Sequence, residues 1–183
     1  MNTLVVIDVQ KDFVNGRLAN PAAQDKMPDI TKKIQNWDGP VIFTQDTHSL
    51  ETFKYSKEGC LPLHCCPAVD DEGWDVMPEA KAAAENKTVD FIEKPTFGCL
   101  DWYESENPEL ERVLDQAESI TVIGFVSEIC VIANLIILRA MFPDKKIVWD
   151  STCSAGLLND KGEQPGHEAA KIIAKAQQIE VVE

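Results

Sequence analysis

Short runs rich in β-branched residues recur along the chain, and stretches with helical spacing separate most of them. We interpret as strands the runs Thr3–Val9, Val41–Gln45, Val89–Ile92, Ile120–Gly124, Ile147–Asp150 and Ile179–Val182. The stretches that we interpret as helices are Pro28–Trp37, Pro108–Ala117, Ser127–Met141 and His167–Gln177. Strands that alternate with helices form a parallel sheet covered on both faces. The sequence therefore predicts an open α/β fold of about six parallel strands.

Length and charge limit what such a fold can do. The 183 residues fit a single domain, which we assign to residues 1–183, because domains commonly hold roughly 100–200 residues. Asp and Glu number 31 against 17 Lys and Arg, which gives a net charge of −14. This charge repels nucleic acid and anionic membrane surfaces, so we expect neither as a partner. A small, uncharged molecule suits an acidic protein better.

The segment from Asp46 to Lys87 is long and rich in turns, with little apolar periodicity. Loops of that length inside a domain usually serve a function, as a lid or a binding loop. We therefore expect a metal-binding or lid loop over about 46–87.

The six cysteines are interpreted as thiols rather than a disulfide framework. The sequence begins without a basic segment and reaches Asp8 after a short apolar run, which is unlike a signal peptide. A chain of this length can also build a core without disulfides. We expect a reducing, cytoplasmic location.

Reactive side chains follow four successive predicted strands. Asp8 ends the first strand, Asp46 and His48 follow the second, Lys94 follows the third, and Cys130 follows the fourth. Ligands of an open parallel sheet bind at the carboxyl ends of its strands, near the point where the strand order reverses. We therefore expect these side chains to meet at one edge of the sheet.

Cys130 is the candidate nucleophile. If Ser127 caps the following helix, the thiol lies in the first helical turn. Free amides and the helix dipole there would lower the thiol pKa and could hold an oxyanion. The alternative is a small apolar residue of a buried helix. Asp8 as proton acceptor and Lys94 as neighbouring positive charge favour the catalytic interpretation, which requires the first and fourth strands to be adjacent.

Asp46, His48 and His64 form a candidate metal site, because one carboxylate and two imidazoles leave coordination positions open for water or substrate. Glu51 or Glu58 could add a ligand. A structural zinc on Cys65 and Cys66 is the alternative, but no C-x-x-C spacing supports it. The third histidine, His167, opens the last predicted helix and is expected at the surface.

These residues belong to short segments that, taken in order, resemble the nicotinamidase/isochorismatase-like cysteine hydrolases over nearly the whole chain. The segments are Val6–Phe13, Thr44–His48, Pro62–Cys65, Glu93–Pro95 and Ser127–Val131, with Asp150–Gly156 resembling the family's turn after its fifth strand. Each segment alone is a weak pattern, whereas the ordered set is specific.

The resemblance implies a Rossmann-like three-layer sandwich with strand order 3-2-1-4-5-6 and a catalytic triad of Asp8, Lys94 and Cys130. It also implies hydrolysis of a small carboxamide, such as nicotinamide or pyrazinamide, to the acid and ammonia through a thioester. The metal trio resembles the nicotinamidase branch and implies a divalent ion, zinc first, with manganese or iron as alternatives. Family members often form dimers or tetramers, so a homodimer or homotetramer is expected.

Further site residues follow from the same resemblance. The backbone N–H groups of Val126 and Cys130 would hold the oxyanion, and the peptide bond between Phe125 and Val126 would be cis. We assign the substrate pocket to Phe13, Leu61, Phe97 and Phe125. At position 61 nicotinamidases tend to carry an aromatic ring, so Leu61 is a departure. An N-carbamoyl amidase, an isochorismatase-like hydrolase and a non-catalytic binding protein on the same scaffold remain the alternatives.

Overall fold

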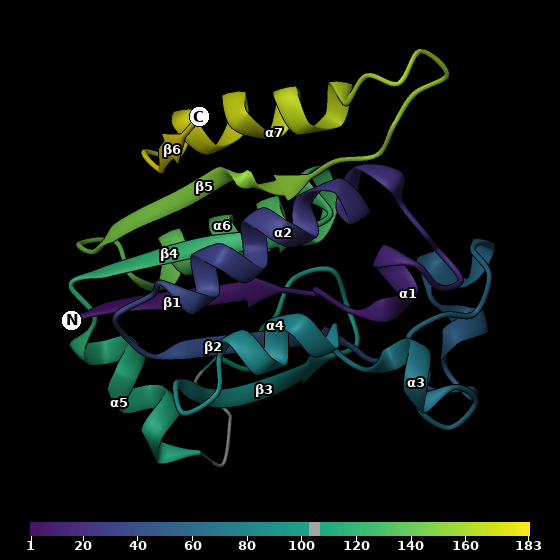
Figure 1. Ribbon diagram of the computed structural model, residues 1–183, viewed down its shortest axis with the longest axis horizontal. Coiled ribbons are helices and arrows are strands. Elements are labelled where there is room, and N and C mark those ends of the chain that lie inside the picture. Colours follow the sequence, from purple (N-terminus) through teal and green to yellow (C-terminus); the bar gives the residue numbers. More distant parts are fainter. Residues whose placement is uncertain (103–106) are drawn as a thin grey trace.

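A computed structural model describes residues 1–102 and 107–183 and contains a six-stranded sheet with the order β3-β2-β1-β4-β5-β6 (Figure 1). All five strand pairs are parallel. The strands are β1 (Asn2–Ile7), β2 (Val41–Asp46), β3 (Thr88–Lys94), β4 (Ser119–Phe125), β5 (Lys146–Ala155) and β6 (Glu180–Val182). The predicted α/β class, strand number and strand order are confirmed.

Helices cover both faces of the sheet. The described helices are α1 (Lys11–Val14), α2 (Pro21–Gln35), α3 (Asp71–Trp74), α4 (Pro78–Ala83), α5 (Pro108–Gln116), α6 (Ile132–Met141) and α7 (Pro165–Ala176). Alternate strand residues point to opposite faces. Val5 and Ile7 pack in a core with residues of α5, α6 and α7, whereas Leu4 and Val6 pack in a second core with α2 and α4. Figure 1 shows α2 and α4 in front of the sheet and α6 behind it.

The helix α2 begins earlier than the predicted start at Pro28. It starts at Pro21, where the Asn20 side chain accepts a hydrogen bond from Ala22 N at 3.1 Å, and Pro28 lies inside it. Proline fits the first turn of a helix because it has no N–H to lose there. Pro21 and Pro28 are both compatible with the start of a helix, and the hydrogen bond between Asn20 and Ala22 N sets the start at Pro21.

The carboxyl ends of β1 and β4 approach each other closely. Ile7 pairs with Gly124, whose φ is +118°, and a Cβ at position 124 would lie 2.1 Å from Ile7 O. Only glycine fits this close approach at that backbone angle. Gly124 therefore allows the chain that follows β4 to pass close to the end of β1.

The segment after β2 runs beyond the same edge. It contains the 3₁₀ turns η1 (Phe53–Tyr55) and η2 (Lys57–Cys60), followed by α3 and α4. In Figure 1, α1, α3 and this segment gather where β1 and β2 end. The expected turn-rich loop is thus made of short helical elements, of which η1, η2 and α3 lie around the strand ends and α4 packs against the sheet.

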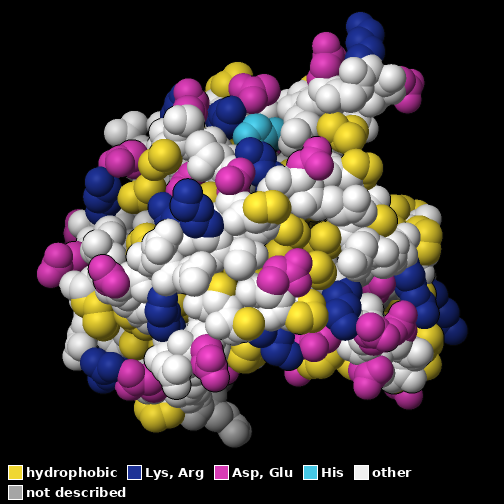
Figure 2. Space-filling view, viewed as in Figure 1, with side chains coloured by type: hydrophobic (Ala, Val, Ile, Leu, Met, Phe, Trp, Pro, Cys, Tyr) yellow, Lys and Arg dark blue, Asp and Glu magenta, His cyan; other side chains and the backbone are white. Residues whose placement is uncertain are grey.

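Charged side chains are distributed over the surface. Figure 2 shows Asp and Glu interspersed with Lys and Arg across the visible face, although the net charge is −14. In the described part of the chain, none of the helices has the length and apolar character needed to cross a bilayer.

Candidate active site

A cavity of about 330 Å³ lies at the carboxyl edge of the sheet. Its described lining residues are Phe13, Arg17, Leu18, Ala19, Asn20, Asp46, Glu58, Leu61, His64, Phe97, Val126, Ile129, Cys130 and Leu157. Most of this lining is apolar, and the polar groups come from separate segments of the chain. Such an enclosure suits a small ligand fixed by a few polar contacts.

Asp8, Lys94 and Cys130 meet beside this cavity, and we call them the thiol cluster. Lys94 Nζ lies 2.7 Å from Asp8 Oδ2 and 3.8 Å from Cys130 Sγ. Asp8 and Lys94 are fully buried, and Cys130 is 5% exposed. Asp8 follows β1 with a φ of 48°, and its Oδ1 accepts a hydrogen bond from Thr44 at 2.6 Å. The structure therefore brings together the three side chains that the sequence assigned to catalysis.

Burial decides the charge states in the thiol cluster. It raises the pKa of Asp8, and the positive charge of Lys94 offsets part of this effect. Burial would lower the pKa of Lys94, but the neighbouring Asp8, Cys130 and Asp46 outweigh it and raise that pKa. Lys94 is thus held as an ammonium between two carboxylates.

The thiol pKa differs from the sequence-based expectation. Burial raises the pKa of Cys130 well above its usual value, and the charges of Asp8 and Asp46 add to this effect, whereas Lys94 opposes it. The expected lowering by a helix N-terminus is wrong, because desolvation and two carboxylates outweigh it. The resting group is a neutral thiol beside a carboxylate that can accept its proton.

The turn that carries Cys130 also differs from the prediction. Ser127–Val131 is a π-helical turn, η3, whose N-cap is Val126. Ser127 Oγ instead forms a 2.7 Å hydrogen bond with Nδ1 of His167, a buried residue rather than the expected surface histidine. Because its hydroxyl is engaged by α7, Ser127 does not cap the helix. The peptide bond between Phe125 and Val126 is cis, as the family resemblance implied.

Asn134 is a site residue that the sequence reasoning missed. Its Nδ2 donates to Cys130 O at 2.8 Å and Phe97 O at 3.1 Å, and its Oδ1 accepts from Cys99 N at 2.9 Å. The fully buried amide thus joins the η3 turn to the segment after β3. An asparagine inside an apolar helical run was the available signal, since a buried amide needs partners.

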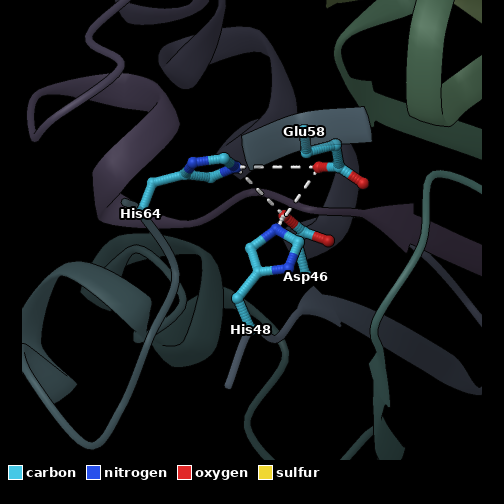
Figure 3. Close-up of side chains that lie close together, drawn as sticks. All are labelled: Asp46, His48, Glu58 and His64. Atoms are coloured by element: carbon cyan, nitrogen blue, oxygen red, sulfur yellow. Dashed lines mark ion pairs between the residues drawn. The ribbon is translucent and has the colours of Figure 1, made fainter. Parts of the chain in front are cut away.

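A second group of side chains lies next to the first, and we call it the imidazole cluster: Asp46, His48, Glu58 and His64 (Figure 3). All four are buried, and their ligand atoms lie within 4.8 Å of one another. Of the two acidic residues considered as additional ligands, Glu58 joins the cluster, whereas Glu51 is exposed. Asp46 belongs to both regions, because its Oδ1 lies 3.4 Å from Lys94 Nζ.

The imidazole cluster has the spacing expected around a cation. His48 Nε2 lies 2.9 Å from Asp46 Oδ2 and 3.3 Å from Glu58 Oε2, yet it has no hydrogen bond of good geometry. His64 Nε2 lies 3.5 Å from Asp46 Oδ2. Ligand atoms about 2.1 Å from one ion are roughly 3.0–3.4 Å apart, and the separations of 2.9–3.9 Å between the imidazole nitrogens and the carboxylate oxygens are close to those around a shared divalent metal.

Charge and orientation agree with that fit. Burial lowers the pKa of His48, but the carboxylates of Asp46 and Glu58 outweigh it and raise the pKa to about 9. The cluster therefore attracts a positive charge, which a proton or a metal ion can supply. His64 Nδ1 is paired with Pro62 O at 2.8 Å, which directs Nε2 toward the other ligands.

Two buried side chains near α1 hold the ligand-bearing segments. Gln10 accepts from Asp46 N at 2.8 Å and donates to Asp46 O at 2.9 Å. Asp12 Oδ2 accepts from Cys65 N at 2.7 Å, and Cys65 O in turn accepts from His48 N. The sequence reasoning did not anticipate these roles, because the partners are distant in the chain.

Three of the four residues predicted for the substrate pocket line this cavity, and their role in substrate binding stays a prediction. Phe13, Leu61 and Phe97 line the cavity, with Leu61 and Phe97 partly exposed at 43% and 40%. Phe125 is wrong as a pocket residue: its side chain is fully buried in the core on the α2 side of the sheet and is not among the described lining residues. Val126 and Cys130 both line the cavity, and their oxyanion role stays a prediction.

The isochorismatase domain model matches residues 2–179 of the chain. No curated protein gives a significant match.

Solved structures share the fold at low sequence identity. Nicotinamidase/pyrazinamidase PncA from Bacillus subtilis is 22% identical with a TM-score of 0.73, covering 100% of this chain and 99% of that one. Pyrazinamidase of Pyrococcus horikoshii in complex with zinc is 19% identical with a TM-score of 0.70, covering 100% and 98%. N-carbamoylsarcosine amidase from Thermoplasma acidophilum is 19% identical with a TM-score of 0.69, covering 99% and 95%.

Proposed function

The chain belongs to the isochorismatase domain family, and we propose that it is a metal-containing cysteine amidase that hydrolyses a small carboxamide of the nicotinamide or pyrazinamide type. The observation that carries this proposal is the contact of Lys94 with both Asp8 and Cys130 beside one cavity. A thiol, a carboxylate able to accept its proton and a fixed ammonium are the groups that thioester chemistry needs.

In the first half of the proposed reaction, Asp8 accepts the thiol proton while Cys130 Sγ bonds to the amide carbonyl carbon. The raised pKa values of both groups keep the proton within the pair until the substrate arrives. The N–H groups of Val126 and Cys130 hold the oxyanion. The C–N bond then breaks, Asp8 returns the proton to the leaving nitrogen, and ammonia departs.

In the second half, Asp8 takes a proton from water as the water attacks the thioester carbonyl. The carbon–sulfur bond breaks, the carboxylic acid leaves, and Cys130 regains its proton. Lys94 keeps its positive charge throughout and offsets the negative charge that moves between Asp8 and the sulfur.

Asp46, His48, Glu58 and His64 would hold a divalent ion, with zinc as the first candidate. When bound, such an ion polarises or orients a ring nitrogen of the substrate, or supplies a bound water. The residues themselves place this charge against the cavity, since Asp46, Glu58 and His64 line it. Because the nucleophile must stay reduced, the reducing cytoplasm is the proposed compartment.

Ammonia release tests the proposal directly. Purified protein loaded with Zn²⁺ or Mn²⁺ and kept reduced is incubated with nicotinamide, pyrazinamide and a panel of small carboxamides. We expect ammonia and the corresponding acid from at least one amide, and an acyl adduct on Cys130 in acid-quenched samples. Cys60→Ala, which alters an exposed cysteine, is the control and keeps full turnover. Absence of ammonia from every amide would refute the proposed activity.

A further inference from the structure

His167 joins α7 to the turn that carries Cys130. Its Nδ1 and Ser127 Oγ are hydrogen-bonded at 2.7 Å, and both residues are buried. His167 lies in the first turn of α7, and the described lining of the cavity contains no residue of that helix. The bond therefore connects the turn of the proposed nucleophile to an element outside the reaction centre.

The start of α7 lies very close to the η3 turn. A Cβ at position 166 would lie 2.3 Å from Glu128 Cδ, so the glycine before His167 makes room for the side chain of Glu128. Glu128 Oε1 accepts a hydrogen bond from Leu157 N at 2.9 Å, and Leu157 lines the cavity. Two consecutive residues of η3, Ser127 and Glu128, are thus bonded to α7 and to the segment that follows β5.

The η3 segment is a single π-helical turn, and side chains from two helices hold it. Val131 N donates to Val126 O at 3.1 Å, which closes the turn around Ser127 and Cys130. Turns of this kind are rare and frequently occur at functional sites. Asn134 Nδ2 donates to Cys130 O at 2.8 Å. The turn is therefore fixed by an amide from α6 and an imidazole from α7.

The imidazole of His167 is uncharged near pH 7. Burial lowers its pKa, and the positive charge of Lys171 adds to this effect, whereas Glu168 opposes it. The ring also packs edge-on against Trp149, with 5.4 Å between the ring centroids. His167 thus makes two separable interactions, a hydrogen bond between neutral groups and an aromatic contact.

We propose that His167 is a positioning residue of the reaction. Through Ser127 it fixes the η3 turn, so that Cys130 Sγ and the N–H groups of Val126 and Cys130 stay directed at the substrate carbonyl. This inference rests on the proposed amidase function and assigns part of it to a side chain outside the described lining of the cavity.

Two substitutions of His167 separate its two interactions. His167→Phe keeps a ring against Trp149 but removes the nitrogen that bonds Ser127. With nicotinamide or pyrazinamide as substrate, we expect it to lower kcat about tenfold and to leave KM within about twofold. His167→Asn loses the ring and leaves a cavity, but its amide places a hydrogen-bonding atom near the position of Nδ1. It should therefore keep at least about half of the wild-type kcat.

Two buried serines provide the matched control. Ser127→Ala removes the hydroxyl that bonds His167, whereas Ser151→Ala removes one that donates to Val182 O, also at 2.7 Å. Both should lower the midpoint of urea denaturation, but only Ser127→Ala should lower kcat, again by about tenfold. In the double variant Ser127→Ala/His167→Phe, kcat should fall no further than in either single variant, because the same bond is lost.

Alkylation of Cys130 gives a readout that needs no turnover. A loosened η3 turn exposes the sulfur, so iodoacetamide should label Cys130 roughly threefold faster in Ser127→Ala and His167→Phe than in Ser151→Ala. If no amide is hydrolysed, this difference still supports the positioning of the turn by His167 while the amidase function fails.

Other results overturn the proposal. A kcat that falls in His167→Asn but not in His167→Phe assigns the effect to ring packing. Losses that multiply in the double variant mean that Ser127 and His167 act separately. Equal kcat values or equal labelling rates in Ser127→Ala and Ser151→Ala mean that the bond does not hold the turn. If His167→Phe does not fold, the comparison of the two serine variants decides alone.

Discussion

The thiol cluster and the imidazole cluster face one cavity but are built differently. Asp8, Lys94 and Cys130 follow or end β1, β3 and β4, and their side chains are at most 5% exposed. In the imidazole cluster only Asp46 belongs to a strand, whereas His48, Glu58 and His64 come from the segment after β2. The sheet thus places the proposed covalent chemistry, and short turns place the proposed metal ligands.

This difference indicates which parts can change independently. A side chain at a strand end is fixed by the register of the whole sheet, as in the pairing of Asp46 with Lys94 across β2 and β3. A side chain on a turn is fixed by a few local hydrogen bonds, such as those of Cys65 with Asp12 and His48. The three ligands on turns, His48, Glu58 and His64, can therefore be altered without disturbing the sheet, whereas Asp46 cannot.

The largest expected effect separates the two clusters by chemistry. Cys130→Ala should lower kcat/KM for any hydrolysed amide by about 10⁴-fold or more, because the nucleophile is gone. Its affinity for zinc should stay within about twofold of the wild-type value, since the sulfur is not among the clustered ligand atoms. Ammonia release and equilibrium dialysis measure the two quantities. Turnover by Cys130→Ala would exclude the thioester route.

Lys94→Met tests whether the thiol cluster depends on its single positive charge. The change leaves Asp8 and Asp46 buried without their shared ammonium, so we expect a loss of about 3–5 kcal/mol in the free energy of unfolding. Urea denaturation measures it. Lys81→Met removes the exposed pair with Asp75 and should cost under about 1 kcal/mol. Similar losses in both variants would contradict a buried ion pair.

Glu51 and Glu58 provide a matched test of the imidazole cluster. Glu58→Gln should weaken zinc binding by about 10- to 100-fold, and His64→Ala by at least as much, because each removes a ligand. Glu51→Gln should leave the affinity unchanged, since Glu51 is exposed and lies outside the cluster. Competition with a chromophoric chelator measures these affinities. Equal effects of the two glutamine variants would remove Glu58 from the site.

Alkylation tests the charge state of the resting thiol. Because burial raises the pKa of Cys130, iodoacetamide should label it more slowly than the exposed Cys60 near pH 7. Its rate should rise about tenfold per pH unit below that pKa, since the thiolate reacts. Asp8→Asn removes a negative charge that raises the pKa and should speed labelling a few-fold. Mass spectrometry of the modified peptides gives the rates, and faster labelling of Cys130 than Cys60 near pH 7 would mean a resting thiolate.

Strand periodicity was sufficient to predict the positions of the thiol cluster. Asp8, Lys94 and Cys130 each follow a recognisable apolar run, and parallel strands bring their carboxyl ends to one edge. The same strand periodicity predicted that Asp46 lies at this edge. For the additional acidic ligand, the sequence narrowed the choice only to Glu51 or Glu58. The segment after β2 has no periodicity from which the direction of a side chain can be inferred.

The predictions that were wrong concern properties that depend on contacts between distant parts of the chain. The partner of Ser127 is His167 on α7, and its hydrogen bond replaced the predicted cap. The thiol pKa depended on carboxylates contributed by β1 and β2, whose combined effect local sequence does not reveal. Phe125 was assigned to the pocket on the family resemblance, whereas strand alternation turns its side chain into the core on the α2 side of the sheet.

The strand order also has a consequence during protein synthesis. β1 lies between β2 and β4, so one of its edges has no partner until the ribosome has delivered Ser119–Phe125. An unpaired edge can pair with other chains, so nascent intermediates that lack β4 present a site for association. Cys130, the proposed nucleophile, lies in the turn that follows β4, so the same late pairing brings it to Asp8. Incomplete translation products that end before β4 therefore lack both a finished sheet and the complete thiol cluster.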